Sequence, residues 1–475
     1  MSQILQRMDQ ARMSGLHRRL AWAAGLGIFL DGYDLVIIGV ALVQLHSLWH
    51  LASNQIGWLG SAALAGSFVG ALAGGRIADR LGRKAIYIID LATFFVAAML
   101  CGLSWNIDSL VIFRFLLGVG IGADYPLSAT YMAEFIPARQ RGAVITWAFG
   151  LWMVGAIVAG LVGYVFLYDA ANGWRWMFIL GALPALLVVY LRGTLPESPR
   201  WYLRHNQPEA AAAVVARLDP TITPDQMERI LAQEKMVLPR KKMPLGRLFK
   251  PPYLRATLLV CLPWFLMDAV GYYLTVYTPL VLSHLGFRTH HAQVLGSAIL
   301  NASFIIGYVP LALWVERIGR IWPQILGFLG GGAALLAVAL AAMHPDTGAV
   351  SPAGPVFSGS VLTIIFGSML AAQIANSFGP GSTTYLLASE VYPTDLRATG
   401  HGFATAFSRL GAVISTFFLP AVARRMGTPH FLMLLAVLSA CGGVLTWLFR
   451  VETARCPLEQ EETVAERSAP TANPR

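Results

Sequence analysis

Three charges spaced along one apolar stretch indicate where this chain could do chemistry. The stretch from Arg114 to Gly142 is mostly apolar, yet it carries Arg114, Asp124 and Glu134 at intervals of ten residues. About 20 helical residues cross the hydrocarbon of a bilayer, so charges with this spacing cannot all lie at its surfaces. A charge at that depth must face protein or a water-filled cavity, and we expect a functional role for this stretch. The alternative is that Asp124 is a structural carboxylate that joins two helices.

Two more carboxylates occur in the first apolar segment, which runs from Leu20 to about Leu45. Asp31 and Asp34 are three residues apart and therefore share one face of a helix. A single carboxylate at mid-span is compatible with a simple helix contact. Two on one face are more typical of a cavity lining, and we expect them to line a cavity.

A third group combines aromatic, acidic and basic side chains. Trp264, Asp268 and Tyr272 follow one another at four-residue spacing, so they lie along one face of a helix. Arg409 lies about ten residues into a later apolar segment, and its planar guanidinium suits a carboxylate or a phosphate. These four residues are expected to bind an anion. The alternative is that Arg409 only neutralises Asp268 or Asp124.

The chemistry available to these groups is proton binding coupled to anion binding. Breaking an ion pair between a buried carboxylate and a guanidinium allows the carboxylate to bind a proton. Carboxylates in an anion site repel the anion unless they are protonated, which links the two binding events. The sequence does not choose among Asp31, Asp34, Asp124 and Asp268. It contains no recognisable nucleophile–base or metal-ligand set, so we expect no enzyme, no metal site and no cofactor.

The composition specifies the fold class. The chain has 475 residues, of which 56% are hydrophobic and 13% are charged, and its mean hydropathy is +0.59. This is typical of an all-α membrane protein, and the length accommodates about twelve transmembrane helices. The apolar runs do not alternate with period two, which excludes a barrel. The net charge of +10 fits cytoplasmic loops next to anionic lipid better than nucleic-acid binding.

The elements that must position these residues fall into two sets. The basic N-terminus, with Arg7, Arg12, Arg18 and Arg19, predicts that both termini are cytoplasmic. Asp90 is interpreted as an interfacial charge, and Asp79 to Lys84 as a short loop. The expected organisation is a first six-helix bundle over residues 1–191, a linker with short helices over 192–254, a second bundle over 255–450 and a disordered tail over 451–475.

An internal repeat supports two halves. DRLGR at residues 79–83 recurs as ERIGR at 316–320, and E-x-x-P-x-x-x-R at 134–141 recurs at 390–397. Two motifs repeated in the same order indicate a duplicated six-helix unit, an architecture of transporters with a site between the halves. Their charges are expected to form a cytoplasmic gate that holds the inner ends shut when the site opens outward. The gate residues are Asp79, Arg83, Glu134, Arg141, Glu316, Arg320, Glu390 and Arg397.

These motifs resemble those of the major facilitator superfamily over nearly the whole chain. GRIADRLGRK at 75–84 and PESPRWYL at 196–203 are similar to signatures of its sugar-porter-type branch. IGADYPLSATYMAEF at 121–135 and the Trp264 group look like phosphate:proton symporters and a bacterial group of metabolite transporters. The resemblance implies a monomeric, proton-coupled secondary transporter in the inner membrane.

The resemblance also implies residue roles. Asp34 and Arg114 match a proton-coupling pair, and Arg409 matches a lysine that holds phosphate. Trp152 stands where many relatives have a glutamine, and these two departures favour an organic acid over phosphate. The segment 264–273 lacks the paired glutamines of sugar porters, which disfavours a sugar. The expected substrate-binding residues are Asp31, Asp124, Tyr125, Trp152, Trp264, Asp268, Tyr272 and Arg409.

The sequence therefore predicts proton-coupled uptake of a small anionic metabolite by alternating access. A glycine series with a proline, typical of antiporters, is absent between Gly150 and Gly163, which favours uptake. Phosphate symport, import of a sugar or another neutral metabolite, and drug efflux are the alternatives within transport. The alternative outside transport is a membrane sensor, for which neither the linker nor the tail offers a signalling domain.

Overall fold

The computed structural model describes residues 7–8, 11–219, 222–234, 245–343, 350–351, 354–355, 357–392 and 394–453. For some residues within these ranges, the structure describes the backbone but not the side chain. Among the expected site residues, these are the side chains of Asp79, Tyr125, Arg141, Glu316 and Arg397.

Long helices make up nearly all of the described chain, and the expected twelve-helix architecture is confirmed. The first six are α2 (Gly15–Trp49), α3 (Ser53–Leu81), α4 (Arg83–Gly102), α5 (Ile107–Phe135), α6 (Ala138–Phe166) and α7 (Gly173–Gly193). The second six are α11 (Leu254–His284), α12 (His290–Ile318), α13 (Ile321–Ala342), α14 (Gly359–Phe378) continued by α15 (Pro380–Glu390), α16 (Thr394–Met426) and α17 (Thr428–Phe449).

Short elements lie in the segments that connect these helices. Between the two sets lie α8 (Pro199–Arg204), α9 (Pro208–Leu218), α10 (Pro224–Glu234) and a 3₁₀ helix, η1 (Leu245–Phe249). The strands β1 (Val350–Ser351) and β2 (Gly354–Pro355) form a small antiparallel hairpin with Val350 opposite Pro355.

The helices have the length and composition of membrane spans. In the part of the chain that the structure describes, eleven are long and apolar enough to cross a bilayer. Of the long helices, α5 is the exception, because three charged residues, Asp108, Arg114 and Asp124, lie in the apolar part of this helix. The chain is thus an integral membrane protein, and the long helix that does not meet this criterion is the one that the sequence singled out.

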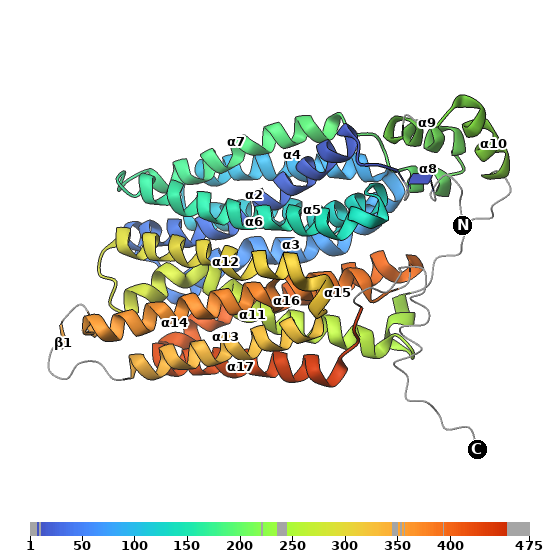
Figure 1. Cartoon of the computed structure of the whole chain (residues 1–475). Coiled ribbons are helices and arrows are strands. Elements are labelled where there is room, and N and C mark those ends of the chain that lie inside the picture. Colours follow the sequence, from blue (N-terminus) through green and yellow to red (C-terminus); the bar gives the residue numbers. More distant parts are fainter. Residues whose placement is uncertain are drawn as a thin grey trace, which may run out of the picture.

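The two sets of helices form two bundles that lie side by side (Figure 1). In the first, α5 packs against α3 and α4, and α2 packs against α6; in the second, α13 packs against α14 and α17, and α11 against α16. Contacts between the bundles join α3 to α16, α6 to α12 and α2 to α11. By order in each set, α3 corresponds to α12 and α6 to α16. The first two contacts are therefore equivalent under the repeat, which is what a duplicated unit should produce.

One end of the molecule carries α8, α9 and α10, and we call it the linker side; the other carries β1 and β2, and we call it the hairpin side (Figure 1). The helix α2 begins and α17 ends on the linker side. Successive long helices therefore cross in alternating directions, so a residue's position along its helix gives its depth.

Close contact between α3 and α5 depends on glycines of both helices. A Cβ at Gly118 of α5 would overlap the backbone of Ala63, and a Cβ at Gly66 of α3 would overlap the backbone of Phe115. Small residues allow helix backbones to approach closely inside a membrane. This packing holds α5, with its charged side chains, at the centre of the first bundle.

Two expected boundaries were wrong, and proline or glycine explains each. The stretch from Arg114 to Gly142 is not one span, because α5 ends at Phe135 and Pro137 precedes α6. Proline cannot donate a backbone hydrogen bond and disfavours a helical residue before it. The loop from Asp79 to Lys84 is reduced to Gly82, whose φ of 98° suits glycine.

Candidate functional site

A cavity lies between the two bundles and gathers five of the expected substrate-binding residues. It encloses about 640 Å³ of empty space, part of it open to solvent, and is lined by residues of α6, α11, α12, α14, α15 and α16. Its lining includes Trp152 from the first bundle and four residues from the second, namely Trp264, Asp268, Tyr272 and Arg409. The four-residue spacing in α11 therefore does place three side chains on one cavity wall.

Arg409 is shared between carboxylates from the two bundles. Its guanidinium nitrogens lie 3.8 Å from Asp268 Oδ2 on α11 and 3.9 Å from Asp31 Oδ2 on α2. It also donates a hydrogen bond to the Tyr272 hydroxyl, and its guanidinium carbon lies 4.9 Å from the centre of that ring. Both ion pairs are at the long end of the range for direct contact. Arg409 is therefore held by two long ion pairs and by its hydrogen bond to Tyr272.

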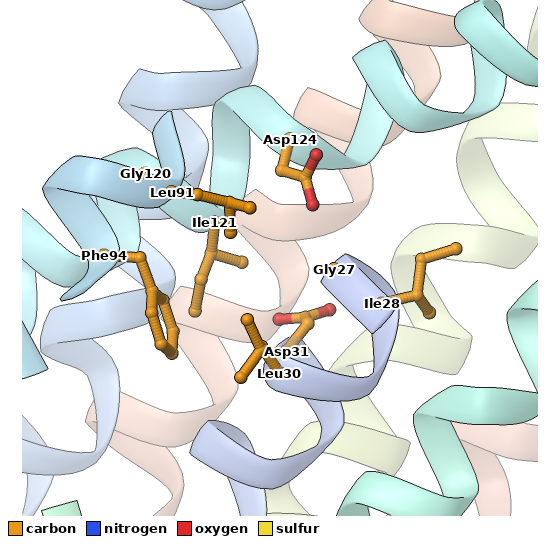
Figure 2. Close-up of a pocket in the computed structure, with 9 residues that line it drawn as sticks. All are labelled: Gly27, Ile28, Leu30, Asp31, Leu91, Phe94, Gly120, Ile121 and Asp124. Carbon is orange, nitrogen blue, oxygen red and sulfur yellow. The ribbon is translucent and has the colours of Figure 1, made fainter. Parts of the chain in front are cut away.

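Asp31 also faces a second, smaller cavity inside the first bundle. This cavity has room for about one water molecule and is lined by parts of α2, α4 and α5. Figure 2 shows the carboxylates of Asp31 and Asp124 turned toward the space between α2 and α5. Neither carboxylate oxygen of Asp31 has a hydrogen-bond partner among the described residues. Asp31 thus lies between Arg409 on one side and Asp124 on the other.

Asp34 and Arg114 form a separate ion pair within the first bundle. Arg114 Nη1 lies 2.5 Å from Asp34 Oδ1, and the two side chains are 0% and 3% exposed. The guanidinium carbon lies 5.6 Å from the centre of the Phe178 ring. Neither residue lines either of the two cavities. The pair therefore lies buried between α2 and α5, outside both cavities.

Asp124 is held by an arginine that the sequence interpretation missed. Arg192, in the last turn of α7, donates to Asp124 Oδ2 at 2.9 Å and lies 2.8 Å from Asp124 Oδ1. Gly27 makes room for the pair, because a Cβ there would overlap Arg192 and Asp124. The interpretation placed Arg192 just beyond the sixth span, in the linker. The helix continues to Gly193 and brings the side chain into the bundle.

The interpretation of Asp90 as an interfacial charge was wrong. Asp90 is 3% exposed, and its Oδ1 lies 3.4 Å from Arg192 Nη1. Arg192 also donates to the Tyr87 carbonyl oxygen at 3.0 Å, and its guanidinium carbon lies 3.4 Å from the centre of the Tyr87 ring. Asp90 can lie at this depth because Arg192 neutralises part of the charge of Asp90 and Asp124.

Replacing Arg192 with alanine should destabilise the protein strongly. The change leaves Asp90 and Asp124 buried without their arginine, and breaking a buried ion pair from one side costs about 3–5 kcal/mol. The measurement is the folded fraction in detergent as a function of temperature. Arg450→Ala, at the exposed end of α17, is the control and should have little effect. Adding Asp90→Asn to Arg192→Ala should recover part of the loss, whereas equal stability of Arg192→Ala and Arg450→Ala would contradict this role.

On the linker side, each bundle contains one ion pair from the expected gate. Arg83 Nη2 lies 3.3 Å from Glu134 Oε1 in the first bundle. Arg320 donates to both oxygens of Glu390 at 2.8 and 3.0 Å in the second. Each pair joins two helices of the same bundle, so neither one links the bundles directly. The side chains of the other four gate residues lie outside the described part of the chain.

Two glutamates near these pairs were not foreseen. Glu197 accepts a hydrogen bond from the backbone N–H of Lys84 at 3.0 Å, at the start of α4. Glu452 accepts from the backbone N–H groups of Arg320 and Ile321 at 3.0 and 3.2 Å, at the start of α13. A carboxylate at a helix N-terminus satisfies backbone donors there and interacts favourably with the helix dipole. Glu197 belongs to the PESPRWYL motif, but no motif indicates Glu452.

On the hairpin side, the two bundles are in direct contact. Tyr277 of α11 lies one to two turns beyond Tyr272, and its hydroxyl lies 3.2 Å from the Ile56 carbonyl oxygen of α3 and 2.8 Å from that of Thr416. A Cβ at Gly57 would lie 2.6 Å from the Phe417 carbonyl oxygen, so α3 and α16 touch backbone to backbone. These contacts join the two bundles on the hairpin side.

Comparison with known proteins identifies the class of protein. Residues 20–465 match the family model described as sugar (and other) transporter. The chain belongs to this transporter family. It is a transporter rather than an enzyme, as the sequence led us to expect.

The names of similar proteins mention several different substrates. The transporter is 32% identical to a putative metabolite transport protein, YaaU, of Escherichia coli K12, with 97% of each chain covered. It is 30% identical to inorganic phosphate transporter 1-1 of Oryza sativa, over 94% of this chain and 93% of the relative. It is 28% identical to the niacin transporter NiaP of Acinetobacter baylyi, over 94% and 96%.

A solved structure shows the same fold. The proton:xylose symporter XylE, of the major facilitator superfamily, superposes with a TM-score of 0.78, over 95% of this chain and all of the other, at 22% identity. The transporter therefore has the major facilitator fold, and the resemblance noted from its motifs is confirmed.

Proposed function

We propose that this transporter imports a small organic anion together with protons. The observation that carries the proposal is the position of Arg409 in the cavity between the bundles, where it is shared by Asp31 and Asp268. Arg409 is the one cationic side chain among the described residues of that lining. A planar, permanently charged guanidinium is suited to binding a carboxylate.

The same arrangement supports coupling to protons. When Asp31 and Asp268 are both ionised, they outnumber the single charge of Arg409, and an added anion makes the local charge still more negative. Protonation of one carboxylate removes that repulsion and frees Arg409 for the anion. We propose that the ion pair between Asp34 and Arg114 breaks and forms again as α2 and α5 move during transport. Asp34 then carries the transported proton.

The names of two relatives support an anionic substrate but do not identify which anion this transporter carries. Phosphate is an anion, and niacin is a carboxylic acid. Phosphate is the second candidate substrate, because Arg409 stands at the position of a phosphate-binding lysine in the resemblance. We further propose that the transporter is a monomer in the inner membrane, with its linker side and both termini in the cytoplasm.

A ligand screen tests the proposal without knowledge of the substrate. The thermal stability of the purified protein should rise with millimolar carboxylic acids, and more at low pH than at high pH. Phosphate and neutral sugars form the other arms of the screen. Stabilisation by a sugar alone would contradict an anion site.

The gate residues allow a separate test of alternating access. We propose that the ion pairs on the linker side stabilise the state that is closed there, so Glu390→Gln, which removes the charge that Arg320 binds, should populate the state open to that side. A single cysteine at Met267, which lines the cavity, should then react several-fold faster with an impermeant thiol reagent applied from the linker side. The control is Glu228→Gln on the exposed face of α10. Unchanged labelling in Glu390→Gln would remove this role.

A further inference from the structure

Aromatic rings form much of the wall of the cavity between the bundles. Six of the fifteen described lining residues are aromatic, and they come from both bundles. Phe149 and Trp152 lie on α6, Trp264 and Tyr272 on α11, Phe304 on α12, and Tyr385 on α15. Rings in a membrane bundle often serve only to pack helices together. Here they surround an open space that also holds a charged group.

These rings face one another across the boundary between the bundles. The centres of the Trp152 and Phe304 rings are 6.1 Å apart, with an angle of 52° between the planes. Phe149 and Tyr385 are stacked at 5.3 Å, and Trp264 meets Tyr385 edge-on at 6.1 Å. A flat, apolar ligand can add further stacked or edge-on contacts of the same kind. A phosphate ion or a small aliphatic acid makes no use of them.

Polar side chains line the cavity from α11, α14, α15 and α16. Gln373 and Asn376 of α14 are three residues apart and line the cavity from one face of that helix. Neither amide is hydrogen-bonded to another side chain of the described residues. Arg409 enters from α16. A ligand that reaches both sets has a charged group at one end and a hydrogen-bonding atom or substituent at the other.

The local charge limits how many negative charges the ligand can carry. Arg409 is already within 3.9 Å of Asp31 and Asp268. A monoanion requires the loss of one carboxylate charge, which one proton provides. With one proton bound, a monoanion leaves the summed charge of the three side chains and the ligand at −1, as in the empty site, whereas a dianion makes it −2 unless a second proton binds. The site therefore favours one negative charge.

We infer that the substrate of this site is an aromatic monocarboxylate, a planar ring that carries one carboxylate. Arg409 binds the carboxylate, and Trp152 and Phe304 contact the ring from the boundary between the bundles. Gln373 and Asn376 bind a ring heteroatom or hydroxyl. This inference rests on the proposed function and narrows it from organic anions to one chemical class.

Matched ligands separate this inference from the proposed function. Binding to the full-length protein in detergent is measured by titration calorimetry for benzoate, 4-hydroxybenzoate, cyclohexanecarboxylate, benzamide, phthalate, phosphate and xylose. Benzoate should bind about tenfold more tightly than cyclohexanecarboxylate, which has the same charge but no flat ring, and 4-hydroxybenzoate should bind at least as well. Benzamide and the dianion phthalate should bind at least tenfold more weakly than benzoate.

The other outcomes are distinct. Equal or tighter binding of cyclohexanecarboxylate or phosphate would overturn the aromatic substrate and leave the anion transporter intact. Binding of xylose but of no anion would overturn both.

Variants of two tryptophans on one helix test the ring contact. Trp152→Leu should reduce the preference for benzoate over cyclohexanecarboxylate from about tenfold to about twofold, while both acids still bind. Trp147→Leu is the control, since Trp147 lies on α6 but is 41% exposed on the outer surface and is absent from the cavity lining. An unchanged preference in Trp152→Leu, or an equal loss in both variants, would contradict the inference.

Discussion

Replacing Arg409 with alanine is expected to weaken anion binding by about 100-fold or more. The variant removes the one cation in the described lining of the cavity and leaves Asp31 and Asp268 without it. Truncating one partner of a buried charge pair typically costs about 2–5 kcal/mol, and here the remaining carboxylates also repel the ligand. Arg409→Lys should keep part of the affinity, because it restores the charge but not the planar fork. Calorimetric titration with benzoate, or with whichever acid of the panel binds best, measures both.

Two further variants distinguish lost recognition from lost folding. Arg425→Ala removes an exposed arginine from the same helix and should leave affinity unchanged. Combining Arg409→Ala with Asp268→Asn removes one orphaned carboxylate, and this protein should be more stable than Arg409→Ala but should still bind poorly. Wild-type affinity in a folded Arg409→Ala protein would eliminate the anion site.

Replacing Asp34 with asparagine should separate exchange from accumulation. The amide has nearly the shape of the protonated carboxylate and no charge, so it imitates the proton-loaded state permanently. Substrate should still bind, and exchange between pools on the two sides of a liposome membrane should continue at a rate within a fewfold of wild type. Uphill uptake driven by a pH gradient should fall to background, because no proton accompanies the substrate.

Both assays are made on the same liposomes, so that a drop in uptake cannot reflect poor reconstitution. Asp108→Asn, at the exposed start of α5, is the control and should behave like wild type in both. If Asp34→Asn still accumulated substrate against its gradient, the proton would be carried elsewhere, and Asp31, Asp124 and Asp268 would be the next residues to change.

The residues that the sequence identified well are those with strong periodic or local signals. The four-residue spacing of Trp264, Asp268 and Tyr272 was enough to place them on one wall, because a helix determines which of its own residues share a face. The number of spans followed from apolar length alone. Buried charges were easy to notice, because a membrane makes each of them costly.

Partners from other helices were harder to predict. Arg192 looked like the first residue of the linker, and it reaches Asp124 and Asp90 because α7 continues to Gly193. Glu452 lies in a segment with no motif, and its contact with the start of α13 depends on where α17 ends. Phe304 and Gln373 carry no local sign of lining a cavity, since their position depends on how the two bundles dock.

The most direct test of the whole account is whether protons enter with the substrate. Liposomes containing the transporter and a luminal pH dye, with no initial pH gradient, receive the best-binding acid of the panel outside. The lumen should acidify faster than in protein-free liposomes, which correct for passive entry of the neutral acid, and the excess should vanish in Asp34→Asn. Substrate entry with no excess acidification, or with a rise in luminal pH, would contradict proton symport.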